Sequence, residues 1–105
     1  MVNVESKIEG NKLTLSVYGE IDHHTAKEIR KEMDKQILSL RPKEVKINLS
    51  AVSFMDSSGL GLIMGRYATV TDIGAELYVL NPTDSVARIM LMAGLDKIVP
   101  IERTK

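Results

Sequence analysis

The sequence predicts a single α/β domain with a mixed, mostly parallel sheet of four to five strands and three or more helices. Short runs in which apolar and polar residues alternate are separated by longer runs whose apolar residues recur every three or four positions. The first two alternating runs adjoin, as in a hairpin, and helical runs separate the later ones, as in parallel strand-helix-strand units. With 105 residues, 44% of them hydrophobic, and no repeat or linker, residues 1–105 are expected to form one domain.

The chain begins with the predicted hairpin. Two alternating runs flank Gly10-Asn11, and Gly19 is expected to end the second run. The apolar residues are Val2, Val4 and Ile8 in the first run and Leu13, Leu15 and Val17 in the second.

Residues 26–40 are predicted to form an amphipathic helix, because their apolar side chains lie three or four positions apart. Thr25 with Glu28 three residues later has the spacing of a capping box, although Asp22 is an alternative cap. Either cap leaves His23 and His24 at the helix entrance. The apolar stripe consists of Ala26, Ile29, Met33, Ile37 and Leu40.

The second half of the chain alternates strands with helices. Pro42 stops the first helix, Gly74 and Gly94 are the expected ends of the next two, and Pro100 indicates that the last strand lies at a sheet edge. The expected elements are a strand at 45–49, a helix from about 57 to 74, a strand at 75–80, a helix that begins after 81–84, and a strand at 98–101.

Composition excludes several classes of function. The 14 basic residues balance the 14 acidic ones, so no overall field attracts nucleic acid or an anionic membrane, and proteins are the expected partners. The absence of cysteine excludes disulfides and thiolate chemistry. With no basic, apolar leader and no membrane-length apolar run, the expected location is the cytoplasm. The charged face of the first helix is typical of a solvated surface with ion pairs such as Arg30 with Asp34.

Two hydroxyls and a carboxylate, those of Ser57, Ser58 and Asp56, lie where the third strand gives way to the second helix. One of these three residues must cap the helix, and capping alone is a sufficient explanation for them. The helix N-terminus can also hold an anion, including a phosphate attached to serine, because its first N–H groups have no partners within the helix. A phosphoserine there would act as a switch on partner binding.

Ser57, Gly61 and Gly65 are four residues apart and share one face of the predicted helix. A glycine inside a helix costs about 1 kcal/mol relative to alanine, so this face needs a packing or docking reason. Either a strand of the same domain or a partner approaches it closely. Leu60 and Met64 beside this face are expected to be core residues. The helix is nevertheless apolar on more than one side, so some of its side chains can face a partner.

Three other chemistries fit the residues poorly. The glycines of 59–65 fall within the predicted helix and no lysine follows them, which disfavours dinucleotide and phosphate-loop sites. Ser57 lacks the glycine two positions before it that a hydrolase nucleophile requires. The side chains of the adjacent His23 and His24 point in different directions, which disfavours a shared metal ion.

Two segments together resemble a known family. They are Gly19-Glu20-Ile21-Asp22-His23-His24-Thr25-Ala26 and Ser53-Phe54-Met55-Asp56-Ser57-Ser58-Gly59-Leu60-Gly61. Over essentially its whole length the chain resembles the anti-sigma factor antagonists, bacterial regulators with the STAS domain that sulphate transporters also contain. The paired histidines and Gly65-Arg66-Tyr67 are most similar to the sporulation type, the antagonist of the anti-sigma F factor.

The resemblance implies a regulator and not an enzyme, with no cofactor. The unmodified protein would bind an anti-sigma factor that is also a serine kinase, and would so free the sigma factor. Phosphorylation by that kinase would end the interaction, and a dedicated phosphatase would restore it. Ser57 matches the family's phosphoacceptor, and the residues that match its docking surface are Asp22, His23, His24, Thr25, Asp56, Ser58, Leu60 and Gly61.

One departure from the family pattern concerns the C-terminal end. Sporulation relatives commonly continue into another helix, whereas this sequence stops at Lys105. More of the sheet or of the third helix is therefore expected to be uncovered. Two other functions stay open from the residues alone: a module that binds a small ligand or nucleotide at the same helix N-terminus, and a scaffold domain without phosphorylation.

Overall fold

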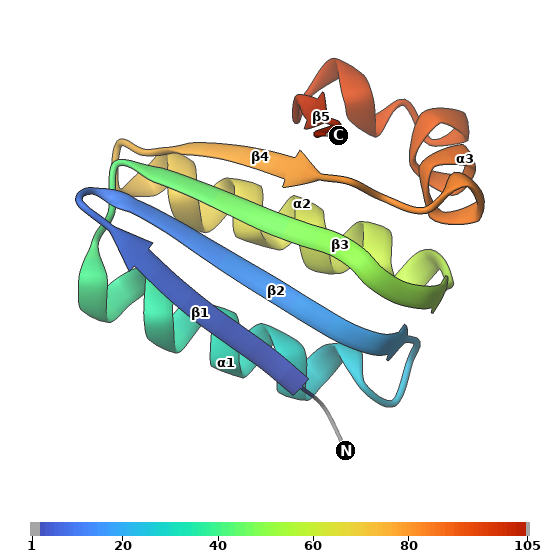
Figure 1. Cartoon of the computed structure of the whole chain (residues 1–105), viewed down its shortest axis with the longest axis horizontal. Helices are drawn as coiled ribbons and strands as arrows, with labels where there is room; N and C mark the ends of the chain where they lie inside the picture. The colour runs from blue at the N-terminus through green and yellow to red at the C-terminus, as the bar shows by residue number, and fades with distance from the viewer. Residues whose placement is uncertain (1–2, 105) are drawn as a thin grey trace.

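The computed structural model describes residues 3–104 and confirms the predicted α/β class and order of elements (Figure 1). Val2, which was expected in the first strand, lies outside the described residues. The elements are β1 (Asn3–Glu9), β2 (Lys12–Ile21), α1 (Ala26–Leu40), β3 (Glu44–Met55), α2 (Ser57–Asp72), β4 (Glu76–Leu80), α3 (Asp84–Met92), a single 3₁₀ turn η1 (Leu95–Lys97) and β5 (Ile101–Glu102).

The strands form one sheet in the order β1-β2-β3-β4-β5. The β1-β2 hairpin is antiparallel, and the three other neighbouring pairs are parallel, so the sheet is mixed and mostly parallel as predicted. α1 connects β2 to β3 and α2 connects β3 to β4, which are the crossovers that parallel neighbours require. β5, which follows Pro100, is an edge strand as expected.

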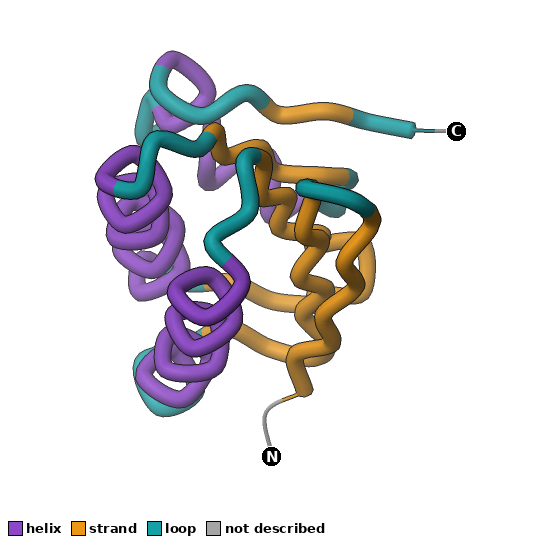
Figure 2. The backbone as a smooth tube through the Cα atoms, turned by 90° about the vertical axis from the view of Figure 1, so that its left-hand side faces the viewer, coloured by secondary structure: helices purple, strands orange, loops and turns teal. Residues whose placement is uncertain are grey.

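α1 and α2 pack side by side on the same face of the sheet (Figures 1 and 2). The alternation in β2 buries Leu13, Leu15 and Val17 against them. Ile29 and Met33 of α1 face the same core and are 1% and 0% exposed. Burying each side chain of this size contributes about 1.5–3 kcal/mol, so the pattern of apolar residues decides which face of each element turns inward. None of the helices in the described chain combines the length and apolarity that crossing a bilayer requires.

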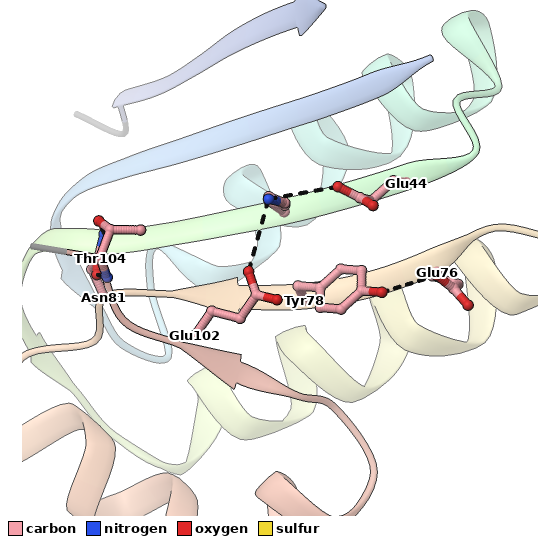
Figure 3. A network of polar contacts seen from close by, with 7 residues as sticks. Glu44, Glu76, Tyr78, Asn81, Glu102 and Thr104 are labelled. Atoms are coloured by element: carbon pink, nitrogen blue, oxygen red, sulfur yellow. Dashed lines mark hydrogen bonds and ion pairs between the residues drawn. The ribbon is translucent and has the colours of Figure 1, made fainter.

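The face of the sheet that α1 and α2 leave uncovered carries a network of polar side chains from β3, β4 and β5 (Figure 3). Successive side chains of a strand point to opposite faces, so the burial of Val45 and Ile47 turns Lys46 outward. Lys46 Nζ lies 3.6 Å from a carboxylate oxygen of Glu44 and 3.8 Å from one of Glu102. Such solvent-facing ion pairs contribute about 0–1 kcal/mol each, so they keep this face hydrophilic more than they stabilise the fold.

The expected bounds of three strands were wrong. β3 does not end at residue 49 but continues to Met55. β2 does not end at Gly19 but continues to Ile21, because an irregularity in its register with β3 accommodates the positive φ of 99° at Gly19. The expected strand at 98–101 is reduced to β5, since the backbone N–H groups of Ile98 and Val99 donate to the Leu95 carbonyl at 3.0 and 2.9 Å. These N–H groups close a helical turn and therefore cannot donate to a neighbouring strand.

Two apolar side chains of the predicted patterns, one in the helical stripe and one in the first strand, lie at the surface. Leu40 in the last turn of α1 is 44% exposed, and Ile8 near the end of β1 is 46% exposed. Both residues lie close to the end of their element, where fewer core side chains are available to cover them. In α3, Leu91 is 55% and Met92 82% exposed, so one side of this helix is uncovered.

Candidate functional site

The ends of β2 and β3 bring the two motif segments together. Ile21 pairs with Met55 as the last residues of two parallel neighbours, and the backbone N–H of Asp56 donates to the Ile21 carbonyl at 3.1 Å. Residues 22–25 and 56–58 leave the sheet at the same edge and therefore form one patch, as the resemblance implied. This adjacency depends on strand pairing between residues more than thirty positions apart.

The start of α2 is capped by Asp56, one of the three residues predicted to do so. Asp56 has extended backbone angles, and its Oδ1 accepts a hydrogen bond of 2.8 Å from the backbone N–H of Ser58. Ser57 is the first residue of the helix, and its side chain is exposed. The hydroxyl therefore faces solvent beside backbone N–H groups that have no helical partner.

We expect Asp56→Ala to lower the free energy of unfolding by about 1 kcal/mol, because the cap of α2 is lost. For a domain of this size the melting temperature should fall by about 4–8 °C. Asp56→Asn is the matched control, since asparagine caps a helix about as well as aspartate. A thermal melt in which Asn destabilises as much as Ala would show that the carboxylate charge, and not the cap, is what matters.

The loop between β2 and α1 is held by Asp22. Its Oδ1 accepts hydrogen bonds of 2.9 Å from the backbone N–H groups of His24 and Thr25. The bond from Thr25 is the main reason why the pKa of Asp22 lies below its ordinary value of 3.8. Thr25 Oγ1 donates to the Glu20 carbonyl at 2.9 Å and makes no cap bond to the helix, so the predicted capping box with Glu28 is wrong and Asp22 organises the helix entrance.

His23 and His24 are both exposed at this entrance. Their ring centroids are 5.6 Å apart in an edge-to-face arrangement. Within residues 3–104 no group of three histidines or carboxylates is placed to hold a metal ion. The two imidazoles are therefore surface groups next to Asp22 and Thr25, available to a partner.

The glycines of α2 differ in what surrounds them. A Cβ at Gly59 would lie 2.2 Å from Cγ of Met55, so this glycine is required by packing. A Cβ at Gly61 or Gly65 would meet no atom within 4 Å, so the alternative that a strand of the same domain approaches that face is wrong. Leu60 and Met64 are half-buried and pack against the core. All three glycines lie inside the helix, as predicted, and not in a turn before it where a dinucleotide site would need them.

The open glycine face borders a groove of about 370 Å³ between α1 and α2. It is lined by Ala26, Lys27 and Arg30 of α1 and by Ser58, Gly61, Leu62, Gly65 and Arg66 of α2. Sequence reasoning missed this feature, because Lys27 and Arg30 looked like an ordinary solvated face. A charged residue at 66, between core positions Ile63 and Val70, was the signal available in the sequence.

Arg66 is the buried charge in this part of the molecule, with 6% of its surface exposed. Its Nε lies 2.9 Å from Oδ1 of Asp34 in α1. The predicted pair of Asp34 with Arg30 is therefore replaced by a pair across the two helices. Burial lowers the pKa of Arg66, the carboxylate of Asp34 raises it, and the nearby charge of Arg30 lowers it further.

The chain is similar to known proteins over almost its whole length. The STAS domain profile matches residues 3–105, so this is a STAS domain protein. The chain is 37% identical over 102 residues to the anti-sigma F factor antagonist of Paenibacillus polymyxa, covering 95% of this chain and 87% of that protein. The chain therefore belongs to the STAS family of anti-sigma factor antagonists, which confirms the resemblance.

Two solved structures share the fold over the whole chain. The anti-sigma factor antagonist SpoIIAA in its unphosphorylated form has a TM-score of 0.83 at 26% identity, with 89% of that chain covered. The Bacillus cell fate determinant SpoIIAA in the phosphorylated form has a TM-score of 0.75 at 25% identity, with 92% of that chain covered. In both comparisons the alignment covers 100% of the present chain.

Proposed function

We propose that this protein, in its unphosphorylated form, binds an anti-sigma factor that is also a serine kinase and thereby releases the sigma factor. Phosphorylation of Ser57 by the bound kinase switches the interaction off, and a phosphatase restores it. The observation that best supports this proposal is the exposed Ser57 hydroxyl on the capped first turn of α2, next to the 22–25 loop.

The fold can carry a phosphate at this position. The N-terminus of a helix favours an anion by about 0.3–1 kcal/mol at an exposed site, which offsets part of the repulsion from Asp56. No core side chain has to move, because Ser57 is exposed and its neighbour Asp56 already caps the helix. The related SpoIIAA has been solved in a phosphorylated form that shares this fold, which supports a switch that leaves the architecture intact.

The proposed docking surface surrounds Ser57 on both segments. It combines hydrogen-bonding side chains and imidazoles of the 22–25 loop with the first two turns of α2. These groups are exposed or half-buried, and their backbone is fixed by the strand pairing beneath them. The surface consists of Asp22, His23, His24, Thr25, Asp56, Ser58, Leu60 and Gly61.

We expect a gain in mass of one phosphate when the protein is incubated with ATP and its cognate anti-sigma kinase, and none with ATP alone. Ser57→Ala should bind the kinase and gain no phosphate, because it lacks the acceptor oxygen. Intact-mass spectrometry of the two proteins measures the gain of phosphate, and titration calorimetry measures the binding of the kinase. A gain of one phosphate by Ser57→Ala would assign Ser58 as the acceptor. Binding of ATP without the kinase would favour a nucleotide-binding module. No gain of phosphate under any of these conditions would favour a scaffold domain without phosphorylation.

A further inference from the structure

The groove between α1 and α2 is left empty by the domain that builds it. Gly61 and Gly65 each place no side chain there, and a Cβ at either position would meet no atom within 4 Å. Each glycine costs about 1 kcal/mol of helix stability relative to alanine. Packing within the domain does not explain that cost, so the free space points to something outside the domain that enters it.

The groove carries excess positive charge. Lys27, Arg30 and Arg66 line it, and no carboxylate does. Asp34 lies 2.9 Å from Nε of Arg66, and Nη1 of this guanidinium has no acceptor in the described structure but is itself buried, so a ligand in the groove would act on Arg66 through its charge and not through a bond to Nη1. Lys27, Arg30 and Arg66 repel one another across the groove, so an anionic group placed between them would be favourable.

We infer that the groove between α1 and α2 receives an acidic side chain, aspartate or glutamate, of the bound anti-sigma factor. This inference rests on the proposed function. A protein partner is favoured because the groove is open to the same surface as the proposed docking residues, two of which, Ser58 and Gly61, form its wall. Leu62 adds an apolar wall against which the methylene groups of such a side chain can pack.

The same arrangement links the groove to the switch. Ser57 directly precedes Ser58 in the groove wall, so a phosphate on it would lie well within one Debye length, about 8–10 Å, of the groove. Its charge of about −2 would compensate the cations and repel an incoming carboxylate. Phosphorylation would then weaken docking through the groove as well as through direct contact.

We expect Arg30→Glu to raise the Kd for the anti-sigma factor at least about tenfold, since one favourable charge pair becomes a repulsive one. Lys35→Glu is the matched control: it makes the same charge change on an exposed residue of α1 outside the groove, and should change the Kd less than about twofold. Arg30→Lys should retain most of the affinity. Titration calorimetry at two salt concentrations measures the effect, and raising the salt should weaken wild type more than Arg30→Glu.

Several outcomes separate this inference from the proposed function. Equal affinities for Arg30→Glu and Lys35→Glu, with wild type forming the complex, would overturn only the inference. Lack of any complex with wild type would overturn both. Inorganic phosphate that shifts the amide signals of Gly61 and Gly65 while Arg30→Glu still binds normally would assign the groove to a small anion instead. Should Arg30→Glu lower the melting temperature, Lys27→Glu tests the same charge from a second groove residue.

Discussion

Ser57→Asp is expected to weaken the complex with the anti-sigma kinase at least about a hundredfold, a loss of about 2.8 kcal/mol. The carboxylate adds a charge at the exposed start of α2, where Asp56 already supplies one. Docking must either desolvate both charges or place them against the partner, and each is unfavourable without a matching cation. The melting temperature should stay within a few degrees, because the new charge lies at the favourable end of the helix dipole.

Ser57→Asn is the matched control for this prediction. It has nearly the same size and shape as the aspartate variant and no charge, so it should retain most of the affinity. Calorimetry for binding and a thermal melt for stability measure the two effects separately. Equal losses of affinity in Ser57→Asn and Ser57→Asp would show that shape and not charge is recognised. A large drop in the melting temperature of Ser57→Asp would show that a negative charge at this position unfolds the protein, contrary to the proposed switch.

The parts of the fold that follow from local pattern could be predicted from the sequence. Leu13, Leu15 and Val17 alternate in a way that only a strand with one buried face explains. The end of β2 could not be placed, because Gly19 ends many strands and continues this one only through an irregularity specific to its pairing with β3. At such a residue the local preference of glycine for a strand end competes with the pairing of the two strands. Only the local preference can be read from the sequence.

The adjacency of the two motif segments was predictable from the sequence, whereas the groove beside them was not. The serine segment and the histidine segment are visible in the sequence, and their meeting follows from the strands that precede them. The groove depends instead on how α1 and α2 pack, which places Arg30 near Arg66 across the two helices. Asp34 is an example of what local spacing cannot predict. The spacing within α1 suggested Arg30 as its partner, whereas the packing of the two helices places Arg66 of α2 beside it.

Gly59→Val is expected to lower the free energy of unfolding by about 3 kcal/mol, at the upper end of what overpacking usually costs. A Cβ at this position lies 2.2 Å from Cγ and 2.4 Å from Sδ of Met55. Met55 is 1% exposed, so its side chain has little free space to move into, and the start of α2 must shift with it. Chemical denaturation should detect this loss in the midpoint of the transition.

Gly61→Val is the matched control, because it makes the same substitution in the same helix at a position with no atom within 4 Å. The change in helix propensity is then the same in both variants, and the difference between them isolates the clash with Met55. Gly61→Val should fold normally yet bind the anti-sigma factor poorly, since its methyl groups enter the groove.

A double-mutant cycle with Met55→Ala tests whether Met55 is the obstacle. If it is, truncating Met55 should lower the free energy of unfolding less in Gly59→Val than in wild type. Additive losses would place the strain of Gly59→Val elsewhere in the helix start.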